Sequence, residues 1–258
     1  EISRPTEEII CEVKKLAKNG IKEIWLLGQN VNSYENGFSK LLKKINKIPG
    51  KFWIRFTSSH PKDFSDDLIE VMKSCEKITP YLNLPVQAGD DKILKKMNRP
   101  YTIAQYKKLI KKVKKEIPNI CLSTDVIVGF PGETKKQFEN TIKLFKEVKY
   151  DMAYISQYSP RPGTVGTKLN DNVSLKEKDG RKKVLNEILK QTALENNKKY
   201  IGKTVEVLMM NNGMGKTNTN KTVKIISKKN FSGKFIKVKI TDVLPWSLKG
   251  KIKKLPRN

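Results

Sequence analysis

The first 160 residues of the 258-residue chain alternate between helix-type and strand-type patterns, and this alternation restricts the fold more than any other feature. The predicted strands cover 22–28, 52–58, 81–86, 120–128 and 151–158. The predicted helices lie between Pro5 and Gly20, over 38–48, after Ser65, and after the capping pairs Thr102/Gln105 and Thr134/Gln137. Strands that alternate with helices form right-handed βαβ units, so the sequence predicts an α/β domain with one mostly parallel sheet.

Polar loops follow all five predicted strands. Their sequences are QNVN at 29–32, SSHP at 58–61, QAGD at 87–90, GFPGE at 129–133 and SPRPGT at 159–164. The carboxyl ends of parallel strands meet at one end of the sheet, where α/β proteins bind their ligands. The sequence therefore predicts one shared binding site, although each loop taken alone is typical of an ordinary turn.

The pattern changes after a predicted helix over 174–199. Three segments then alternate apolar and polar residues, at 204–210, 222–227 and 234–243, and turns rich in Asn and Gly separate them. This pattern predicts a small antiparallel β-barrel. We therefore expect two domains, at 1–199 and 200–258.

The chain carries 53 Lys or Arg against 26 Asp or Glu, which gives a formal charge of +27. Many of the lysines fall on predicted helices, where they are usually solvated surface residues. Residues 201–258 differ, because they combine 14 Lys or Arg and only 2 Asp or Glu with a strand pattern. A basic β module favours nucleic acid as its partner, since each phosphate contact releases bound counterions.

Several kinds of site are excluded. The cysteines, Cys11, Cys75 and Cys121, fit neither a disulfide framework nor a C-x-x-C metal site, which favours a reducing compartment, the cytoplasm. His60 is the only histidine, so a histidine metal centre is excluded. Residues 213–217 resemble the end of a phosphate-binding loop but lack its first glycine. No segment is long and apolar enough to span a membrane.

Six motifs extend over nearly the whole chain, in an order that is known from one family. They are LLGQNVNSY (26–34), RFTSSHPKDFSDDLI (55–69), LNLPVQAGDDKILKKMNRPYT (82–102), STDVIVGFPGET (123–134), YSPRPGT (158–164) and WSLKG (246–250). With these motifs the chain resembles the radical S-adenosylmethionine methylthiotransferases, and most closely the MiaB-like branch that acts on tRNA.

The resemblance implies a partial (β/α)6 barrel that lacks its first strand and binds S-adenosylmethionine, followed by an RNA-binding TRAM domain. In this family a [4Fe-4S] cluster cleaves S-adenosylmethionine to a radical, and the enzyme adds a methylthio group to C2 of isopentenyl-adenosine beside the anticodon. The expected partners are a tRNA anticodon stem-loop and an electron donor, and we expect a monomer.

The family's C-x-x-x-C-x-x-C loop holds the radical-generating cluster, and it belongs just upstream of Glu1, where this chain begins. We therefore expect a piece of a longer enzyme that binds no cluster and is inactive by itself. One alternative is a noncatalytic RNA-binding remnant. Another is a methylthiotransferase that acts on a ribosomal protein or on threonylcarbamoyl-adenosine.

The resemblance also implies site residues. The cofactor-binding positions are Gln29, Asn30, Ser58, Ser59, Gln87, Val128, Gly129 and Arg161, and the RNA-binding positions are Lys216, Lys221, Lys224 and Lys249. Val128 and Gly129 are expected to offer their backbone to the adenine, because a glycine lets a flat ring approach closely. Arg161 is expected to meet a carboxylate or a phosphate. Arg99 is left out of the site, because it suits a structural ion pair equally well.

Overall fold

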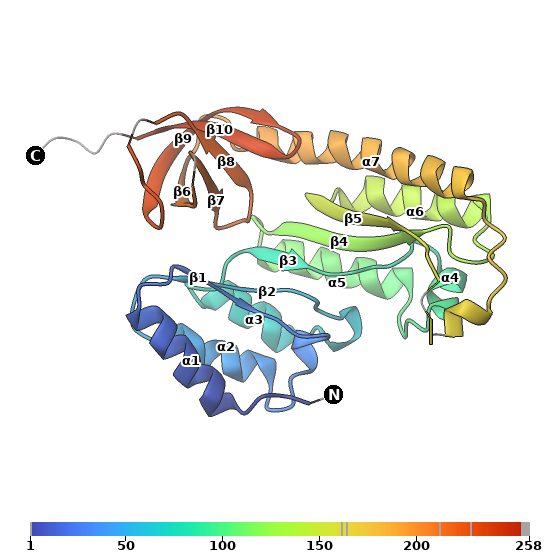
Figure 1. The fold of residues 1–258 in the computed structure, drawn as a ribbon, viewed down its shortest axis with the longest axis horizontal. Helices are drawn as coiled ribbons and strands as arrows, with labels where there is room; N and C mark the ends of the chain where they lie inside the picture. The colour runs from blue at the N-terminus through green and yellow to red at the C-terminus, as the bar shows by residue number, and fades with distance from the viewer. Residues whose placement is uncertain (1, 161, 164, 212, 228, 254–258) are drawn as a thin grey trace, which may run out of the picture.

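The structure is a computed structural model, and it describes residues 2–160, 162–163, 165–211, 213–227 and 229–253. It contains two domains that one long helix, α7 (Leu175–Lys198), connects (Figure 1). The boundary that the sequence predicts, near residue 200, stays a prediction. None of the helices in the described ranges is long and apolar enough to cross a membrane.

The first domain is built on five parallel strands. They are β1 (Glu23–Leu26), β2 (Trp53–Phe56), β3 (Tyr81–Asn83), β4 (Cys121–Val128) and β5 (Met152–Gln157). β1 pairs with β2, and β4 pairs with both β3 and β5. A single bridge between Ile54 and Ile78 joins the two groups. The predicted parallel α/β architecture is thus confirmed.

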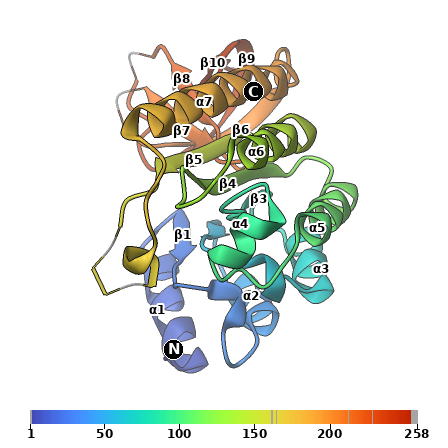
Figure 2. The same cartoon turned by 90° about the vertical axis from the view of Figure 1, so that its right-hand side faces the viewer.

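Helices lie along the outer side of this curved sheet (Figure 2). They are α1 (Thr6–Lys18), α2 (Phe38–Asn46), α3 (Asp66–Ser74), α5 (Ile103–Glu116) and α6 (Lys135–Val148). The short helix α4 (Asp91–Lys96) lies at the carboxyl ends of the strands (Figure 1). Three short 3-10 turns, η1 (Val31–Ser33), η2 (Pro61–Asp63) and η3 (Val165–Lys168), lie in the loops. α5 and α6 begin with the predicted capping boxes at Thr102 and Thr134, which satisfy free N–H groups of the first turn.

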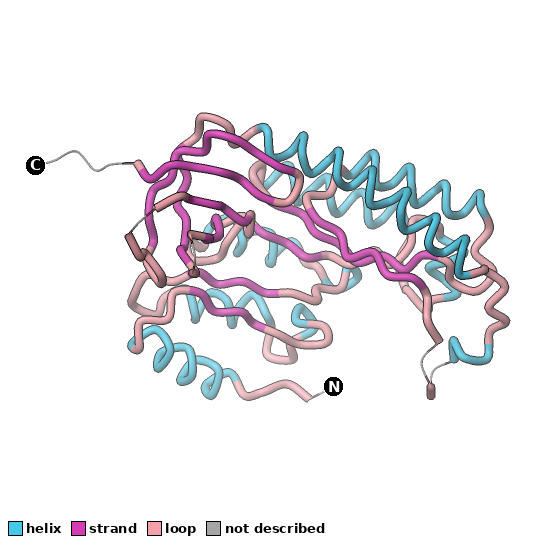
Figure 3. The backbone as a smooth tube through the Cα atoms, turned by 45° about the horizontal axis from the view of Figure 1, so that its top comes forward, coloured by secondary structure: helices cyan, strands magenta, loops and turns pink. Residues whose placement is uncertain are grey.

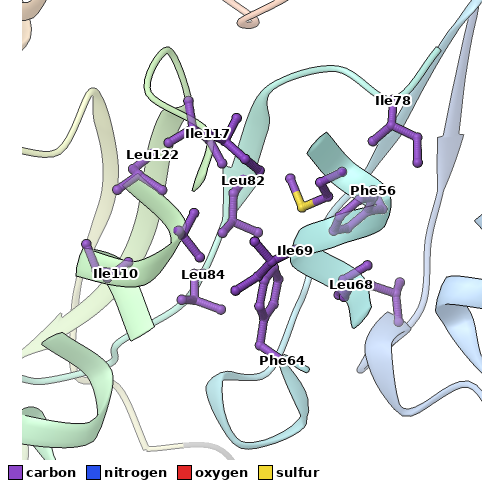
Figure 4. Close-up of a cluster of buried hydrophobic side chains, with 14 of the residues drawn as sticks. Phe56, Phe64, Leu68, Ile69, Ile78, Leu82, Leu84, Ile110, Ile117 and Leu122 are labelled. Carbon is purple, nitrogen blue, oxygen red and sulfur yellow. The ribbon is translucent and has the colours of Figure 1, made fainter. Parts of the chain in front are cut away.

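Apolar side chains from the helices and strands form the core of the first domain. Leu68 and Ile69 of α3, Ile110 of α5 and Leu82 of β3 are among the residues that pack there (Figure 4). Each of these four is less than 5% exposed. This packing fixes the strands, and therefore the loops that follow them.

The second domain is a closed five-stranded barrel with its own apolar core. Its strands are β6 (Thr204–Met209), β7 (Met214–Thr217), β8 (Thr222–Ile225), β9 (Phe235–Leu244) and β10 (Ser247–Ile252), drawn in magenta in Figure 3. The predicted barrel is confirmed, and β7 and β10 are additions to the predicted strands. All pairs are antiparallel except β8 with β10, which is parallel.

The turn between β7 and β8 inserts against the amino-terminal end of the first domain's strands. Arg55 of β2 donates hydrogen bonds from Nη2 to the carbonyl oxygen of Thr217, at 2.9 Å, and from Nη1 to that of Asn218, at 2.7 Å. Its Nε donates to Glu23 Oε1, at 2.5 Å. The guanidinium lies near the rings of Trp25 and Trp53, at 5.6 and 5.2 Å from their centroids. A buried arginine thus joins the two domains.

Candidate cofactor site and nucleic-acid surface

A cavity of about 1420 Å³ opens at the carboxyl ends of the parallel strands. All five loops that the sequence singled out contribute to its lining, through Gln29, Ser58, Ser59, His60, Pro61, Gln87, Phe130, Pro131, Gly132 and Ser159. The convergence follows from the parallel order of the strands, because their carboxyl ends all lie at the same end of the sheet. The described part of the first domain therefore has a large cavity to which all five loops contribute.

Two residues of the predicted site have a strained backbone. Ser58 and Gln87 have φ angles of 60° and 68°, in the left-handed region that favours glycine. The Gln87 backbone is held there from both sides, because its N–H donates to Asp125 and its carbonyl accepts from the N–H of Ile127. Strain of this kind costs about 1–3 kcal/mol per residue and clusters at functional sites.

Two polar atoms in the cavity lining are buried and have no hydrogen-bond partner among the described residues. They are Ser59 Oγ and Arg99 Nε. An unsatisfied buried group costs about 1–3 kcal/mol, so a polar ligand that bonds to these atoms would be stabilised. Arg99, which the sequence analysis left out, has no ion-pair partner within the described ranges. The geometry places it in the site.

Asn30 differs from its neighbour Gln29. Its Nδ2 donates to Asp63 Oδ2, at 2.8 Å, and the residue is not part of the cavity lining. Asn30 therefore holds Asp63, which follows the second loop, and does not line the cavity.

A polar pair in the barrel interior was missed by the sequence analysis. Asn83 of β3 donates from Nδ2 to Asp125 Oδ2 of β4, at 3.1 Å, and both residues line the cavity. Burial raises the pKa of Asp125, and the hydrogen bond from Asn83 opposes this rise. Asp125 and Ile127 lie two residues apart in β4 and are half-buried, whereas Thr124, Val126 and Val128 beside them are buried. The period of two in a strand is the signal that could have placed Asp125 on the cavity side.

The cavity lining corrects the prediction for Val128. Val128 is fully buried and is not part of the lining, whereas Ile127 faces the cavity. The N–H of Gly129 is already used, because it donates to Glu133 Oε2, at 2.7 Å, and the backbone contact expected of Gly129 stays a prediction. A Cβ atom at Gly129 would lie 2.3 Å from Cγ of Lys178, so the missing side chain makes room for that lysine. Arg161 lies outside the described residues.

A buried ion pair holds the fourth loop against α7, and a second ion pair joins α7 to the segment just before it. Glu133 Oε2 accepts a hydrogen bond from Arg181 Nη1, at 2.7 Å, and Lys178 Nζ pairs with Asp171 Oδ2, at 2.6 Å. Burial raises the pKa of Glu133, while the Gly129 N–H and Arg181 act against this rise. These contacts are structural, because none of the four paired side chains lines the cavity.

The charge of the cavity comes from Lys96 and Arg99, together with Asp125. His60 adds none at neutral pH, because burial and the nearby charge of Arg99 lower its pKa from an ordinary value of 6.5. Its Nδ1 accepts a hydrogen bond from the N–H of Lys62, at 3.2 Å. His60 therefore acts as a neutral wall of the site.

The side chains that could bind a metal or a cluster are not grouped together in the described part of the chain. This part contains no group of three His, Cys, Asp or Glu side chains that could hold a metal ion. Cys11 is exposed on α1, Cys75 follows α3 and Cys121 is buried in β4. These thiols lie on separate elements, so the described residues do not fit a [4Fe-4S] cluster. The unpaired atoms of Ser59 and Arg99 do fit the polar amino-acid end of S-adenosylmethionine.

Two of the predicted RNA-binding lysines lie at the domain boundary. Lys221 is only 8% exposed, and its Nζ pairs with Asp151 Oδ1, at 2.5 Å, just before β5. Lys216 is half-buried, donates to Asn220 Oδ1, at 2.9 Å, and has its pKa lowered by burial. Insertion of the β7–β8 turn between the domains explains both positions. Lys221 is corrected to a residue that joins the domains.

The other two predicted lysines are exposed on the outside of the barrel. Lys224 of β8 and Lys249 of β10 lie directly opposite each other. Lys251 of β10 and Lys239 of β9 form the next exposed pair, and Lys237 is two residues away on the same strand. We call these five residues the lysine face. Asp242 and Glu206 are its acidic neighbours in the described ranges, at 2.8 Å from Lys249 and 3.9 Å from Lys237.

Comparison with curated proteins gives relatives with one shared name, tRNA-2-methylthio-N(6)-dimethylallyladenosine synthase. The relatives from Bacillus cytotoxicus and Clostridium botulinum strain Langeland are each 46% identical to this chain, over 99% and 97% of its length. A relative from Acetivibrio thermocellus is 45% identical over 98%. These alignments cover 53%, 58% and 55% of the relatives, so the chain spans little more than half of their length.

Solved structures show the same fold at low sequence identity. A coproporphyrinogen III oxidase from Escherichia coli, a radical SAM enzyme, superposes with a TM-score of 0.57 at 15% identity, over 74% of this chain and 48% of the oxidase. A methylornithine synthase has a TM-score of 0.52 at 20% identity, over 73% and 55%. Sequence profiles of the radical SAM superfamily and of the TRAM domain match residues 1–145 and 198–253. The chain therefore belongs to the radical SAM superfamily, carries a TRAM domain, and has relatives named tRNA-2-methylthio-N(6)-dimethylallyladenosine synthase.

Proposed function

We propose that this chain is the S-adenosylmethionine-binding and RNA-binding part of a tRNA methylthiotransferase. The reaction adds a methylthio group to C2 of isopentenyl-adenosine beside the anticodon. The relatives' shared name supports this reaction. The observation that carries the proposal is the cavity. Its lining combines two residues with a strained backbone, Ser58 and Gln87, and two residues with an unpaired buried polar atom, Ser59 and Arg99. An intact cavity also favours the enzyme over a noncatalytic remnant.

The cavity residues divide by chemistry into two groups. Arg99 suits the carboxylate of S-adenosylmethionine, because its planar fork of donors matches that group, while Gln29 and Ser59 offer hydrogen bonds to the rest of the amino-acid end. Ile127 and Phe130 supply apolar surface for the adenine, and Gln87 suits the ribose. Bound S-adenosylmethionine supplies the radical and methyl chemistry. The described residues contribute binding, orientation and exclusion of water.

RNA is the partner that the lysine face favours. Five exposed lysines on adjacent strands match a phosphate backbone, which favours tRNA over a ribosomal protein as the substrate. The anticodon stem-loop as the bound part, an external electron donor, a monomeric enzyme and the cytoplasm as its location belong to the same proposal.

The test is the affinity of the chain for an anticodon stem-loop RNA as a function of salt. The double variant Lys224→Ala/Lys249→Ala should bind more weakly and reduce the slope of log K against log salt by about 0.7–0.9 for each lost phosphate contact. Lys14→Ala/Lys15→Ala removes equal charge from exposed positions on α1 and is the matched control. Equal losses in the two double variants would show that charge alone, and not the lysine face, binds the RNA.

A further inference from the structure

A second, smaller cavity of about 190 Å³ lies at the boundary of the two domains, near the amino-terminal ends of β3, β4 and β5. Both domains line it. The first domain contributes Met152 and Tyr154 of β5, and the second contributes Lys216, Thr222 and Trp246. We call this cavity the seam pocket. It shares only Tyr154 with the cofactor cavity, so it is a separate site.

Large apolar side chains are exposed at the seam pocket. Trp246, in the turn between β9 and β10, is 50% exposed, Tyr154 is 53% exposed and Met152 is 37% exposed. The other two tryptophans of the chain, Trp25 and Trp53, lie against Arg55. Flat rings that are held at a cavity mouth offer stacking surfaces to another flat ring.

The lining also contains a polar atom without a partner. Asn197 is only 1% exposed and lines the seam pocket. Its Nδ2 donates to the carbonyl oxygens of Leu244 and Pro245, at 2.8 and 3.0 Å, which fixes the orientation of the amide. Its Oδ1 accepts no hydrogen bond from the described residues. The pocket therefore combines aromatic walls with one unused acceptor.

The lysine face leads directly to this pocket. Lys249 lies three residues after Trp246, and Lys224 lies two residues after Thr222, which lines the pocket. Lys249 and Lys224 are opposite each other on β10 and β8, and Lys216 lies opposite Thr222 on β7. A phosphate chain on the lysine face would thus have the stacking surface of Trp246 beside it.

We propose that the seam pocket binds one unpaired nucleobase of the RNA whose phosphates lie on the lysine face. The base stacks on Trp246 and Tyr154, and its N–H groups match the free Oδ1 of Asn197. Aromatic side chains next to a basic strip are the usual means of holding single-stranded nucleic acid. This inference rests on the proposed binding of RNA by the second domain. It adds a base-binding site at the opposite end of the strands from the cofactor cavity.

The test compares two ligands on the 258-residue chain. One is a single-stranded oligoadenylate of about ten nucleotides, within the site size of small RNA-binding folds. The other is an abasic ribose-phosphate oligomer of equal length, which keeps the phosphates and lacks the bases. Trp246→Ala should weaken oligoadenylate binding about tenfold and leave the abasic oligomer unchanged, since stacking on one aromatic ring is lost. Trp246→Phe, which keeps a ring, should restore most of the affinity.

A spectroscopic readout supports the same test without relying on affinity. An oligoadenylate that contains 2-aminopurine should lose fluorescence when it binds the unmodified chain, because stacking quenches this base, and the loss should shrink in Trp246→Ala. If Trp246→Ala weakens the binding of both oligomers equally, or of neither, the proposed base-binding site is wrong. The proposal that the lysine face binds phosphates is not contradicted by that result. If Lys224→Ala/Lys249→Ala leaves both oligomers unaffected, or the chain binds neither, the proposed RNA function itself fails.

Discussion

Two arginines near opposite ends of the parallel sheet have different roles, Arg55 on β2 and Arg99 in the loop between α4 and α5. At the amino-terminal end, Arg55 is 1% exposed and donates from all three of its nitrogens. At the carboxyl end, Arg99 lines a large cavity with its Nε buried and unpaired among the described residues. A buried arginine that has all of its hydrogen-bond partners holds the fold together. A buried arginine that lacks a partner in the cavity is expected to bond to a ligand.

The largest effect should come from removing Arg55, whose three nitrogens all donate hydrogen bonds. Arg55→Ala leaves Glu23 and two carbonyl oxygens of the β7–β8 turn without their buried partner. We expect the free energy of unfolding to fall by about 4 kcal/mol, measured by urea denaturation. Lys51→Ala removes the more exposed Lys51–Glu206 pair at the same boundary and should cost less than about 1 kcal/mol. Similar losses for the two variants would mean that Arg55 does not join the domains.

Gly129→Ala should come next, as an effect on folding. The added Cβ meets Lys178 at 2.3 Å, and Gly129 has a φ of 70°, so strain and overlap together should cost about 3 kcal/mol of unfolding free energy. Gly20→Ala is the control, because Gly20 has a φ of 81° but no atom near its Cβ position. The difference between the two variants measures the overlap. No difference would mean that Lys178 moves aside and that overlap with its side chain is not why a glycine stands at position 129.

Arg99→Ala should weaken binding without lowering stability, because it removes a buried N–H that has no partner among the described residues. If Arg99 holds the carboxylate of S-adenosylmethionine, losing this charged hydrogen bond should weaken binding by about 2 kcal/mol, roughly thirtyfold, in titration calorimetry. Arg4→Ala, which removes an exposed arginine on the surface, should bind normally. A large drop in stability with unchanged affinity would instead make Arg99 a structural residue like Arg55.

The smallest expected effect is a pH dependence at Asp125. Because burial raises the pKa of Asp125 above its ordinary 3.8, the folded chain holds this proton more tightly than the unfolded chain. The free energy of unfolding should therefore decrease as pH rises from about 4 through the raised pKa. Asp125→Asn should flatten this part of the curve in urea titrations at several pH values. Glu35→Gln, at an exposed position, should leave the curve as it is.

Local signals predicted much of the fold. The capping boxes at Thr102 and Thr134 and the five strand-to-loop transitions depend on neighbouring residues, and all of them occur in the structure. β7 was missed because its sequence, Met214–Thr217, has few of the branched and aromatic residues that strands favour. The parallel pairing of β8 with β10 joins distant segments, and no local pattern carries that information.

The sequence predicted the location of the cavity more accurately than the individual residues that line it. The polar loops after the strands predicted the place of the cavity, and the family resemblance supplied Gln29, Ser58, Ser59 and Gln87, which all line it. Asp125 was missed because it lies within a strand, where only the alternation of side chains shows which way it faces. Lys221 was misassigned because its partner, Asp151, is 70 residues away, so the sequence offers no sign that this lysine is paired.

The β7–β8 turn has a consequence for protein engineering. A chimera that exchanges the C-terminal barrel at residue 200 would cut through no secondary structure, yet it would replace Thr217 and Asn218, whose carbonyl oxygens Arg55 requires. Every residue type has a backbone carbonyl, so a grafted barrel can still offer acceptors to Arg55. It does so only if its β7–β8 turn is long enough to reach Arg55. Grafts should therefore be chosen by the length of this turn, and overall sequence identity is the poorer guide.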